Sequence, residues 1–335
     1  MKVLLTGAGG FLGKRLALSL LDKGATELRV HYRQLPAAEV VSSLGRRSPE
    51  ARVTAVAANL LARGSMETMV GGVDCIVHAA AGMRGAAADM FANSVVGTRN
   101  LLEAAGAAGV RRIVLISSFS VYRTEPLAKG ALLAETTPLE EVGTNKGPYG
   151  YAKTRQEQLF LDFQRENGFE SVILRPGVIY GPGSSAMSPR VGINALGFFF
   201  SLGGSATLPL TYVDNCADAI AQAAFTAPAG SAFNVVDDDL PSCATYLKAY
   251  QREVRRARTV RIPYWMFLQS SKLLTRYHRV SKGQLPAVFT PYVVRSMYRP
   301  LRYSNAALKA IGWSQGVSTQ RALDISLRHW REQQA

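Results

Sequence analysis

The first half of the chain alternates between short apolar runs and longer segments with one apolar face. The apolar runs contain few polar positions, which is typical of strands buried on both faces of a parallel sheet. The segments between them predict helices that cover the sheet, joined by right-handed crossovers in a doubly wound α/β fold. The expected strands are Lys2–Thr6, Leu28–Tyr32, Val53–Ala57, Val73–Ala79, Arg112–Ser117 and Ser171–Arg175, and the expected helices are Phe11–Lys23, Ser94–Gly106 and Tyr149–Asn167.

The second half is less regular, and prolines interrupt it. A helix over Asp214–Ala224 and a strand over Ala232–Val236 indicate that the chain returns to the main sheet there. The sequence after Lys248 is basic and aromatic and is interrupted by prolines, which predicts a smaller, mostly helical lobe. The expected division is a main domain of residues 1–180 and 211–237, a substrate-binding lobe of residues 181–210 and 238–310, and a C-terminal helix over 311–335.

The segment Val191–Val213 contains no charged residue and is long enough to cross a bilayer. Gly203, Gly204 and Pro209 interrupt it, and such residues disfavour a stable spanning helix. An apolar lid or pocket lining is therefore expected.

Basic residues are concentrated in one block. The 335-residue chain has a formal net charge of +15, and fourteen Lys and Arg stand beside one acid, Glu253, between Lys248 and Lys309. Such a block indicates an anionic partner, namely a charged substrate, an acidic membrane surface or nucleic acid, unless it is a solvated basic surface. No nucleic-acid-binding module accompanies it, so no nucleic acid is expected as a partner.

Composition limits the class of protein further. Hydrophobic residues make up 47% of the chain, which excludes global disorder. Three scattered cysteines (Cys75, Cys216 and Cys243) argue against a disulfide framework or a zinc site, so no metal is expected. The N-terminal apolar run ends at Gly7, so no secretory leader is expected and the predicted location is the cytoplasm.

A glycine-rich loop joins the first strand to the first helix. Gly7 permits a tight turn, Gly10 lets a pyrophosphate approach the backbone, and Gly13 lets helix and strand pack closely. Phosphates bind the free N–H groups at such a helix N-terminus, so the loop predicts a dinucleotide site. After the second strand, Arg33 stands where no acid is present to bind a ribose 2′-hydroxyl. Its guanidinium suits a 2′-phosphate, which favours NADP over NAD.

Tyr149 and Lys153 are four residues apart on a predicted helix and therefore share one face. A nearby ammonium favours the phenolate, so we expect Lys153 to lower the pKa of Tyr149 from its usual value near 10. The phenol can then exchange a proton with a substrate oxygen while a hydride moves to or from a nicotinamide. Tyr151 does not qualify, because Arg155 follows it at the same spacing.

The Gly-x-x-Gly-x-x-Gly loop and the Tyr-x-x-x-Lys motif together resemble the extended short-chain dehydrogenase/reductases. This branch includes the NAD-dependent epimerase/dehydratases and the 3β-hydroxysteroid dehydrogenase-like enzymes. The resemblance runs nearly end to end and implies a Rossmann fold. It implies that Ser118, four residues before Tyr122, donates a hydrogen bond to the substrate oxygen, with Ser120 beside it in the substrate pocket. It also implies that Lys153 holds the nicotinamide ribose.

The resemblance implies a wider set of cofactor-binding residues in the loops that follow the strands. Two positions depart from the family pattern. Asn59 stands where Asp is usual, and Ser94 stands where Asn is usual with Asn93 one residue earlier, so the choice between Asn93 and Ser94 stays open. The implied residues are Gly7, Gly9, Gly10, Phe11, Leu12, Gly13, Arg33, Asn59, Leu60, Ala79, Ala80, Ala81, Tyr149, Lys153, Pro176, Gly177 and Val178.

Three functions compete. The uncharged Val191–Val213 and the aromatic Ile262–Leu268 favour hydride transfer to or from a hydroxyl or keto carbon of a bulky, partly apolar substrate. Arginines able to clamp a pyrophosphate, namely Arg84, Arg190, Arg299 and Arg302, favour a nucleotide-sugar epimerase, dehydratase or reductase. A non-catalytic NADP-binding regulator is disfavoured because the motif residues are present.

The expected partners follow from these functions. A small-molecule substrate is expected at Arg84, Ser118, Ser120, Tyr149 and Arg190. The resemblance implies a homodimer in which helices near 94–108 and 149–167 pair. The basic block allows peripheral contact with an acidic membrane surface.

Overall fold

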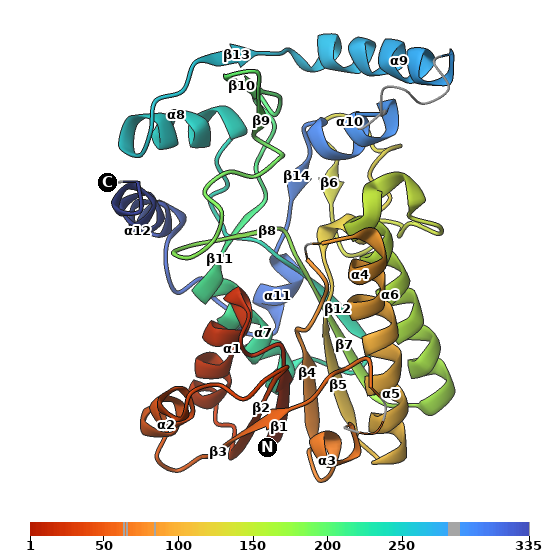
Figure 1. Cartoon of the computed structure of the whole chain (residues 1–335), viewed down its shortest axis with the longest axis vertical. Coiled ribbons are helices and arrows are strands. Elements are labelled where there is room, and N and C mark those ends of the chain that lie inside the picture. The colour runs from red at the N-terminus through yellow and green to blue at the C-terminus, as the bar shows by residue number, and fades with distance from the viewer. Residues whose placement is uncertain (63, 65, 84, 281–288, 335) are drawn as a thin grey trace.

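The computed structural model describes residues 1–335 except 63, 65, 84, 281–288 and 335. Seven strands form one sheet in which every neighbouring pair is parallel. Their order is β12-β7-β5-β4-β1-β2-β3, so the winding reverses between β1 and β4 (Figure 1). The predicted doubly wound parallel sheet is confirmed. The strands are β1 (Lys2–Thr6), β2 (Glu27–Tyr32), β3 (Arg52–Ala57), β4 (Cys75–His78), β5 (Arg112–Ile116), β7 (Glu170–Pro176) and β12 (Ser231–Val235).

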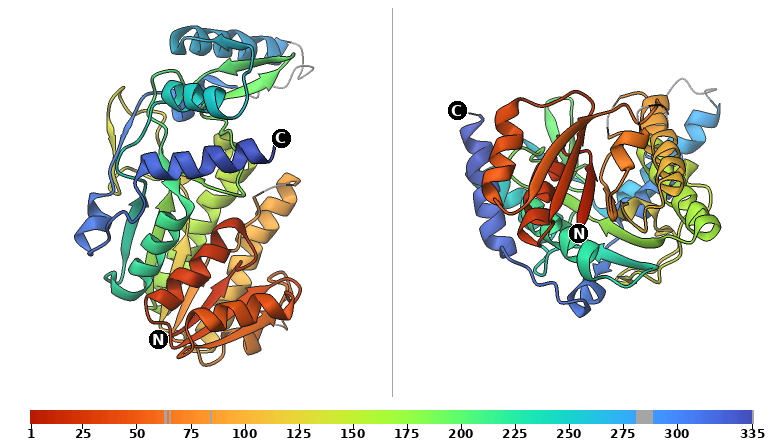
Figure 2. Two further views of the ribbon diagram at one scale, coloured as in Figure 1. Left: turned by 90° about the vertical axis from the view of Figure 1, so that its left-hand side faces the viewer. Right: turned by 90° about the horizontal axis from the view of Figure 1, so that it is seen from below.

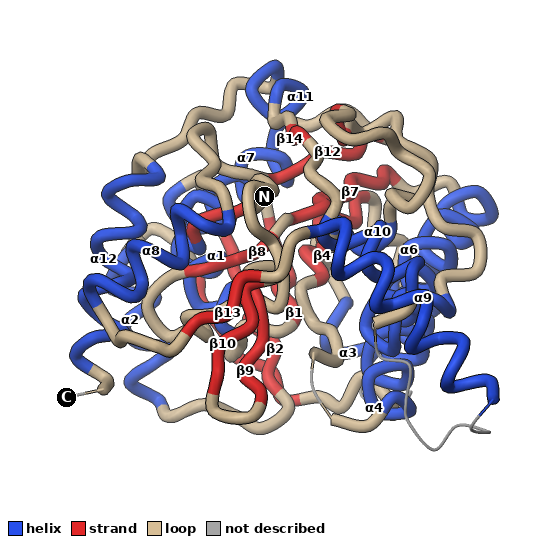
Figure 3. Tube along the Cα trace, turned by 90° about the horizontal axis from the view of Figure 1, so that it is seen from above, coloured by secondary structure: helices blue, strands red, loops and turns tan. Residues whose placement is uncertain are grey.

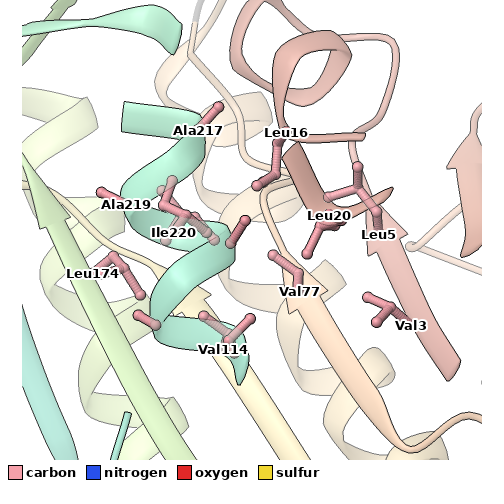
Figure 4. Packing of buried hydrophobic residues seen from close by; sticks show 14 of the residues in the cluster. Val3, Leu5, Leu16, Leu20, Val77, Val114, Leu174, Ala217, Ala219 and Ile220 are labelled. Atoms are coloured by element: carbon pink, nitrogen blue, oxygen red, sulfur yellow. The ribbon is translucent and has the colours of Figure 1, made fainter. Parts of the chain in front are cut away.

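Helices cover both faces of the sheet (Figure 2), which explains the long apolar runs in its central strands. Along β1, Val3 and Leu5 belong to one core and Leu4 to the core on the opposite face. Figure 4 shows the first core, where alanines of α7 let that helix approach α1 closely. One layer contains α1 (Phe11–Asp22), α2 (Ala38–Arg47), α7 (Val213–Thr226) and α11 (Ala306–Ala310). The other contains α3 (Met66–Val70), α4 (Ala87–Phe91), α5 (Gly97–Ala107) and α6 (Gly147–Asn167).

A smaller lobe lies beyond the carboxyl ends of the strands, at the top of Figure 1. Its helices agree with the sequence analysis, but it also holds a three-stranded sheet of order β13-β10-β9 that the pattern did not reveal. The lobe contains β9 (Gly192–Ala195), β10 (Phe198–Ser201), β13 (Thr259–Arg261), α8 (Cys243–Glu253), α9 (Tyr264–Val280) and α10 (Pro291–Tyr298).

Short parallel strand pairs and a final helix link the lobe to the main sheet. Strand β8 (Val178–Tyr180) pairs with β11 (Leu210–Tyr212), and β6 (Leu132–Leu133) pairs with β14 (Arg302–Tyr303). Helix α12 (Thr319–Glu332) packs against α8. The division into domains stays a prediction.

The uncharged segment Val191–Val213 forms the β9–β10 hairpin and β11 rather than a helix. Within the described ranges, no helix combines the length and the apolar character needed to cross a membrane.

Candidate active site

A cavity of about 1050 Å³ opens at the carboxyl ends of the central strands, between the sheet and the lobe. The loops after β1, β4 and β5 form one side, and α10 forms part of the other. Because β1 and β4 lead the chain in opposite directions, this is the crevice in which open α/β sheets bind ligands.

The glycine loop leaves no room for side chains where it meets the cavity. Gly7 has a φ of +74°, and a β-carbon there would lie 2.9 Å from the nitrogen of Ala80. A β-carbon on Gly13 would lie 2.1 Å from the carbonyl oxygen of Gly7. No side chain caps the N-terminus of α1 at Gly10, and its first turn has no acid. The N–H groups there are open to an anion, so the loop fits a dinucleotide pyrophosphate.

The adenosine end of the cavity carries an unpaired cation. Arg33 is exposed, lines the cavity and forms no ion pair with any acid that the structure describes. Asn59 also lines the cavity, and its side-chain oxygen accepts a 3.0 Å hydrogen bond from the nitrogen of Leu61. Its amide nitrogen is therefore the group that can contact a ligand.

The candidate catalytic side chains come from β5 and α6. Ser118 follows β5, and its hydroxyl accepts a 3.2 Å hydrogen bond from the nitrogen of Ser120, which fixes the turn. Tyr149 and Lys153 lie in the first turns of α6, and all three side chains line the cavity. Ser118 lies close enough to the Tyr149 hydroxyl to favour its ionised form.

Burial changes both titrating groups. It raises the pKa of Tyr149, and the effect of Ser118 only partly opposes this change. Burial lowers the pKa of Lys153 to about 8, while Glu157 opposes that shift. The predicted lowering of the pKa of Tyr149 is therefore wrong for this structure, because desolvation of the phenol is the larger effect. Tyr149 is a neutral phenol at physiological pH and can donate a proton.

A buried chain of polar groups connects Lys153 to Thr6 at the end of β1, just before the glycine loop. The Lys153 ammonium donates to the side-chain oxygen of Gln156 at 2.9 Å, and the Gln156 amide donates to the Thr98 hydroxyl at 2.8 Å. The ring of His78 bridges the hydroxyls of Thr98 and Thr6 at 2.8 and 2.7 Å. Burial lowers the pKa of His78 to about 3, so this ring is neutral and has a structural role in the network.

A buried ion pair holds α6 against β7. The guanidinium of Arg175 lies 2.5 Å from a carboxylate oxygen of Glu157, and it also donates to the Tyr122 hydroxyl at 3.0 Å. The hydroxyl of Ser117, next to Ser118, donates to Glu157. This cluster fixes the helix that carries Tyr149 against the strand ends.

The substrate end of the cavity is cationic. Arg190 lines it and donates a 3.0 Å hydrogen bond to the carbonyl oxygen of Met297. Lys146 lines it and lies 3.7 Å from a carboxylate oxygen of Glu140. Among the described residues, the lining includes these two cations, Arg33 and Lys153, but no Asp or Glu. The buried hydroxyl of Ser120 has no hydrogen-bond partner in the part of the chain that the structure describes.

The structure gathers the predicted site residues around this one cavity. Every residue predicted for catalysis, for the cofactor or for substrate contact beside Ser118 lines it except Arg84, which lies outside the described residues. Asn93 lines the cavity, whereas Ser94 is buried and its hydroxyl accepts a 3.0 Å hydrogen bond from the nitrogen of Gly82. Asn93 is therefore the candidate for contact with the cofactor.

Two of the proposed pyrophosphate-clamping arginines lie elsewhere. Arg299 donates to the carbonyl oxygen of Leu127, and Arg302 donates to that of Gly130 at 3.0 Å. Neither lines the cavity. The role suggested for them is wrong for this structure, because both side chains instead bind backbone carbonyl groups of the segment before β6.

Several lining residues were missed in the sequence. Lys146 lies one helical turn before Tyr149, and this spacing could have indicated it. Helix α10 contributes Tyr292, Val293, Ser296 and Met297. No local signal indicates these four, since the fold brings them to the site from far along the chain.

Known proteins share this architecture. A 2-alkyl-3-oxoalkanoate reductase of Stenotrophomonas maltophilia is 34% identical over 233 residues, which are 65% of this chain and 63% of that protein. The match thus spans less than two thirds of that relative. A 4-hydroxy-2-methyl-3-oxo-4-farnesyl-3,4-dihydroquinoline-1-oxide ketoreductase of Stigmatella aurantiaca is 27% identical over 97% of this chain and 95% of that protein.

Solved structures show the same fold. A UDP-glucuronic acid 4-epimerase from Bacillus cereus in complex with NAD has a TM-score of 0.71 at 20% identity, covering 100% of this chain and 99% of that one. The model of the NAD dependent epimerase/dehydratase family matches residues 3–235, which is more than half of the sequence. The chain therefore belongs to the NAD-dependent epimerase/dehydratase family and is an enzyme of that family.

Proposed function

We propose that this enzyme is an NAD(P)-dependent oxidoreductase that interconverts a keto and a hydroxyl group on a bulky, partly apolar substrate. The observation that carries the proposal is that Ser118, Tyr149 and Lys153 all line the same cavity. Ser118 is close enough to Tyr149 to favour the phenolate, and Lys153 follows Tyr149 on the same helix face.

The chemistry assigned to these side chains is proton transfer. In the reductive direction, Tyr149 donates its phenolic proton to the carbonyl oxygen as that oxygen gains negative charge. Ser118 hydrogen-bonds to the same oxygen and polarises the carbonyl. Lys153 favours the phenolate that remains and holds the nicotinamide ribose. A bound reduced nicotinamide supplies the hydride that the carbonyl carbon accepts. A phenol that burial keeps protonated suits this direction.

The walls of the cavity support an apolar substrate. Apolar side chains from the lobe line the end beyond Tyr149, namely Met187, Leu208, Leu210, Val293 and Met297. Two relatives are named for ketone reduction, one on an alkyl-substituted oxoalkanoate and one on a farnesyl-bearing ring. We therefore propose a ketone that carries a long apolar chain.

The proposed cofactor preference is NADP over NAD. Arg33 lies at the end of β2 with no acidic partner among the described residues and can pair with a 2′-phosphate. Membership of the family supports binding of a nicotinamide dinucleotide, whichever of the two it is.

A second candidate is a nucleotide-sugar epimerase, dehydratase or reductase. The observation that favours it is the lining without acids, in which Lys146 and Arg190 provide positive charge beyond what the dinucleotide requires. This function ranks second because only one of the arginines expected to bind a pyrophosphate, Arg190, lines the cavity among the described residues.

Product analysis separates the two candidates. The protein is mixed either with NADPH and a long-chain 3-oxo ester, or with the oxidised cofactor (NAD⁺ or NADP⁺) and a UDP-hexose. Net oxidation of NADPH with the oxo ester supports the first function. Conversion of the UDP-hexose without net change in the cofactor contradicts it and supports the second.

The remaining proposals concern the assembly and location of the enzyme. We propose that α5 and α6 pair across a homodimer in the cytoplasm. The support is the family resemblance and the exposed outer side of α6. Sedimentation of the purified protein tests the dimer, and a monomeric mass would contradict it.

A further inference from the structure

Helix α9 lies at the far end of the lobe (Figure 1), and several of its large apolar side chains are exposed. Met266, Leu273, Tyr277 and Val280 recur at intervals of seven, four and three residues, so they share one face. Leu273 is 69% exposed and Val280 is 75% exposed. Trp265, 66% exposed, stands at the start of the helix. The polar Gln269 and Ser270 interrupt this apolar stripe between Met266 and Leu273. Large apolar side chains gathered on one exposed helix face still mark an interaction surface.

The opposite face of α9 is firmly anchored. Phe267 is buried and packs edge-on against Phe289 and Tyr298, with ring centroids 5.3 and 5.2 Å apart. Ser271 is also buried on this side. The exposed stripe therefore belongs to a helix with a well-packed inner face.

Positive charge flanks the apolar stripe. Exposed Lys and Arg lie on α9 and on the segment that leads into it through β13, and none forms an ion pair in the described part of the chain. The one acid of the basic block, Glu253, lies 2.7 Å from Arg252. An apolar helix face bordered by basic residues is typical of helices that lie in the interface of an anionic bilayer. The exposed cations are Arg255, Arg256, Arg258, Arg261, Lys272 and Arg276.

The neighbouring hairpin extends the apolar surface. Strand β10 pairs with β13, and the turn of the β9–β10 hairpin exposes Leu196 and Phe198. Val260 of β13 is exposed as well. These elements lie at the top of Figure 1, and the view from above shows β13, the hairpin and α9 facing the reader (Figure 3).

We propose that α9, β13 and the β9–β10 turn dock the enzyme on the surface of a membrane that contains anionic phospholipids. The apolar stripe enters the interfacial region, and the flanking arginines and lysines contact phosphate groups. This goes beyond the proposed function, because it concerns a surface outside the cavity. Docking of this kind would also let an apolar substrate pass from the membrane into the cavity. Val294 of α10 packs in the core beneath α9, whereas Val293 lines the cavity, so docking brings the cavity wall close to the lipid.

Tryptophan fluorescence tests the proposal directly. Trp313 and Trp330 are each only 3% exposed, so a spectral change on contact with lipid reports Trp265. We expect a blue shift with vesicles of phosphatidylcholine and phosphatidylglycerol, and none with phosphatidylcholine alone. Added salt weakens the effect, because it screens the attraction. Trp265→Phe removes the shift without abolishing vesicle binding.

Matched variants identify the surface. Leu273→Glu places a charge on the stripe, and Leu35→Glu changes a leucine of similar exposure (65%) on another part of the molecule. We expect Leu273→Glu to weaken co-sedimentation with acidic vesicles at least tenfold and Leu35→Glu to leave it unchanged. Absent vesicle binding, or equal loss in both variants, overturns the proposal. Self-association that Leu273→Glu abolishes, with no vesicle binding, also overturns it and makes this face a dimer interface. These measurements need no turnover, so they do not depend on the proposed reaction.

Discussion

Lys153 donates a 2.8 Å hydrogen bond from its ammonium to the carbonyl oxygen of Ile116, the last residue of β5. Ser118 follows two residues later, and Tyr149 precedes Lys153 by one turn of α6. The bond therefore ties the helix that carries the phenol to the strand end that carries the serine. Positioning of the proposed proton donor depends on this contact between a side chain and the backbone.

Tyr149→Phe should reduce turnover by about 10²- to 10⁴-fold, because it removes the proton donor and leaves the ring in place. Dissociation constants for the cofactor, measured by fluorescence titration, should stay nearly unchanged. Equal losses of turnover and cofactor affinity would argue that Tyr149 has a binding role instead.

Ser118→Ala should shift the pH dependence of the oxidative reaction. Ser118 lowers the pKa of Tyr149, so the loss of its hydroxyl raises that pKa. Oxidation requires the phenolate, and the rising limb of the kcat profile should move to higher pH. A lower kcat whose pH profile keeps its rising limb at the same pH would show that Ser118 does not affect the pKa of Tyr149.

Arg33→Ala should weaken NADP binding at least tenfold, because it removes the cation proposed for the 2′-phosphate. NAD has no such phosphate, and its affinity should change little. Arg46→Ala, an exposed arginine on α2, serves as the control. Equal effects of Arg33→Ala on both cofactors, measured by calorimetry, would refute the assignment.

Gly13→Ala should abolish dinucleotide binding and destabilise the fold by roughly 2 kcal/mol or more, because a β-carbon there would lie 2.1 Å from the carbonyl oxygen of Gly7. Gly45→Ala is the matched control, since a β-carbon at this helical position meets no atom within 4 Å. That change should stabilise the protein by up to about 1 kcal/mol. Urea denaturation compares the two variants, and similar unfolding free energies would contradict the packing argument.

The unfolding free energy of the protein should depend on pH, because the fold lowers the pKa of Lys153. The pKa of Lys153 falls from 10.5 unfolded to about 8 in the fold, so the unfolded state binds more protons between these values. The contribution of Lys153 to stability therefore rises with pH in this window. Relative to Lys153→Met, the wild-type protein should gain about 2 kcal/mol between about pH 7 and about pH 9.5. A pH-independent difference in unfolding free energy would show that the ammonium is not desolvated as the fold indicates.

Local patterns predicted the main sheet well, because strands buried on both faces differ from amphipathic helices even in a single sequence. The expected helix at Ser94–Gly106 illustrates the limit. It begins as a π-helical turn over Ala92–Val96 before α5, and periodicity does not distinguish these forms. The three-stranded sheet of the lobe was missed because its strands are short and because β13 comes from a distant part of the chain.

The glycine loop and the Tyr-x-x-x-Lys spacing were sufficient to locate the cavity, since both place chemical groups at fixed local positions. The pKa of Tyr149 was not predictable, because it depends on burial by the assembled fold. Tyr292 and Met297 of α10 reach the cavity only through packing of the lobe. Local motifs thus indicate the cofactor end of the site better than the substrate end.

A single-turnover experiment tests the central claim most directly. The wild-type protein and Tyr149→Phe, each loaded with NADPH, are mixed with a long-chain ketone, and the absorbance of the reduced nicotinamide is followed with alcohol formation. The account predicts that the wild-type protein forms one alcohol for each NADPH consumed, whereas the variant binds NADPH normally and forms almost none. Equal alcohol formation by both proteins would contradict the role of Tyr149 as proton donor.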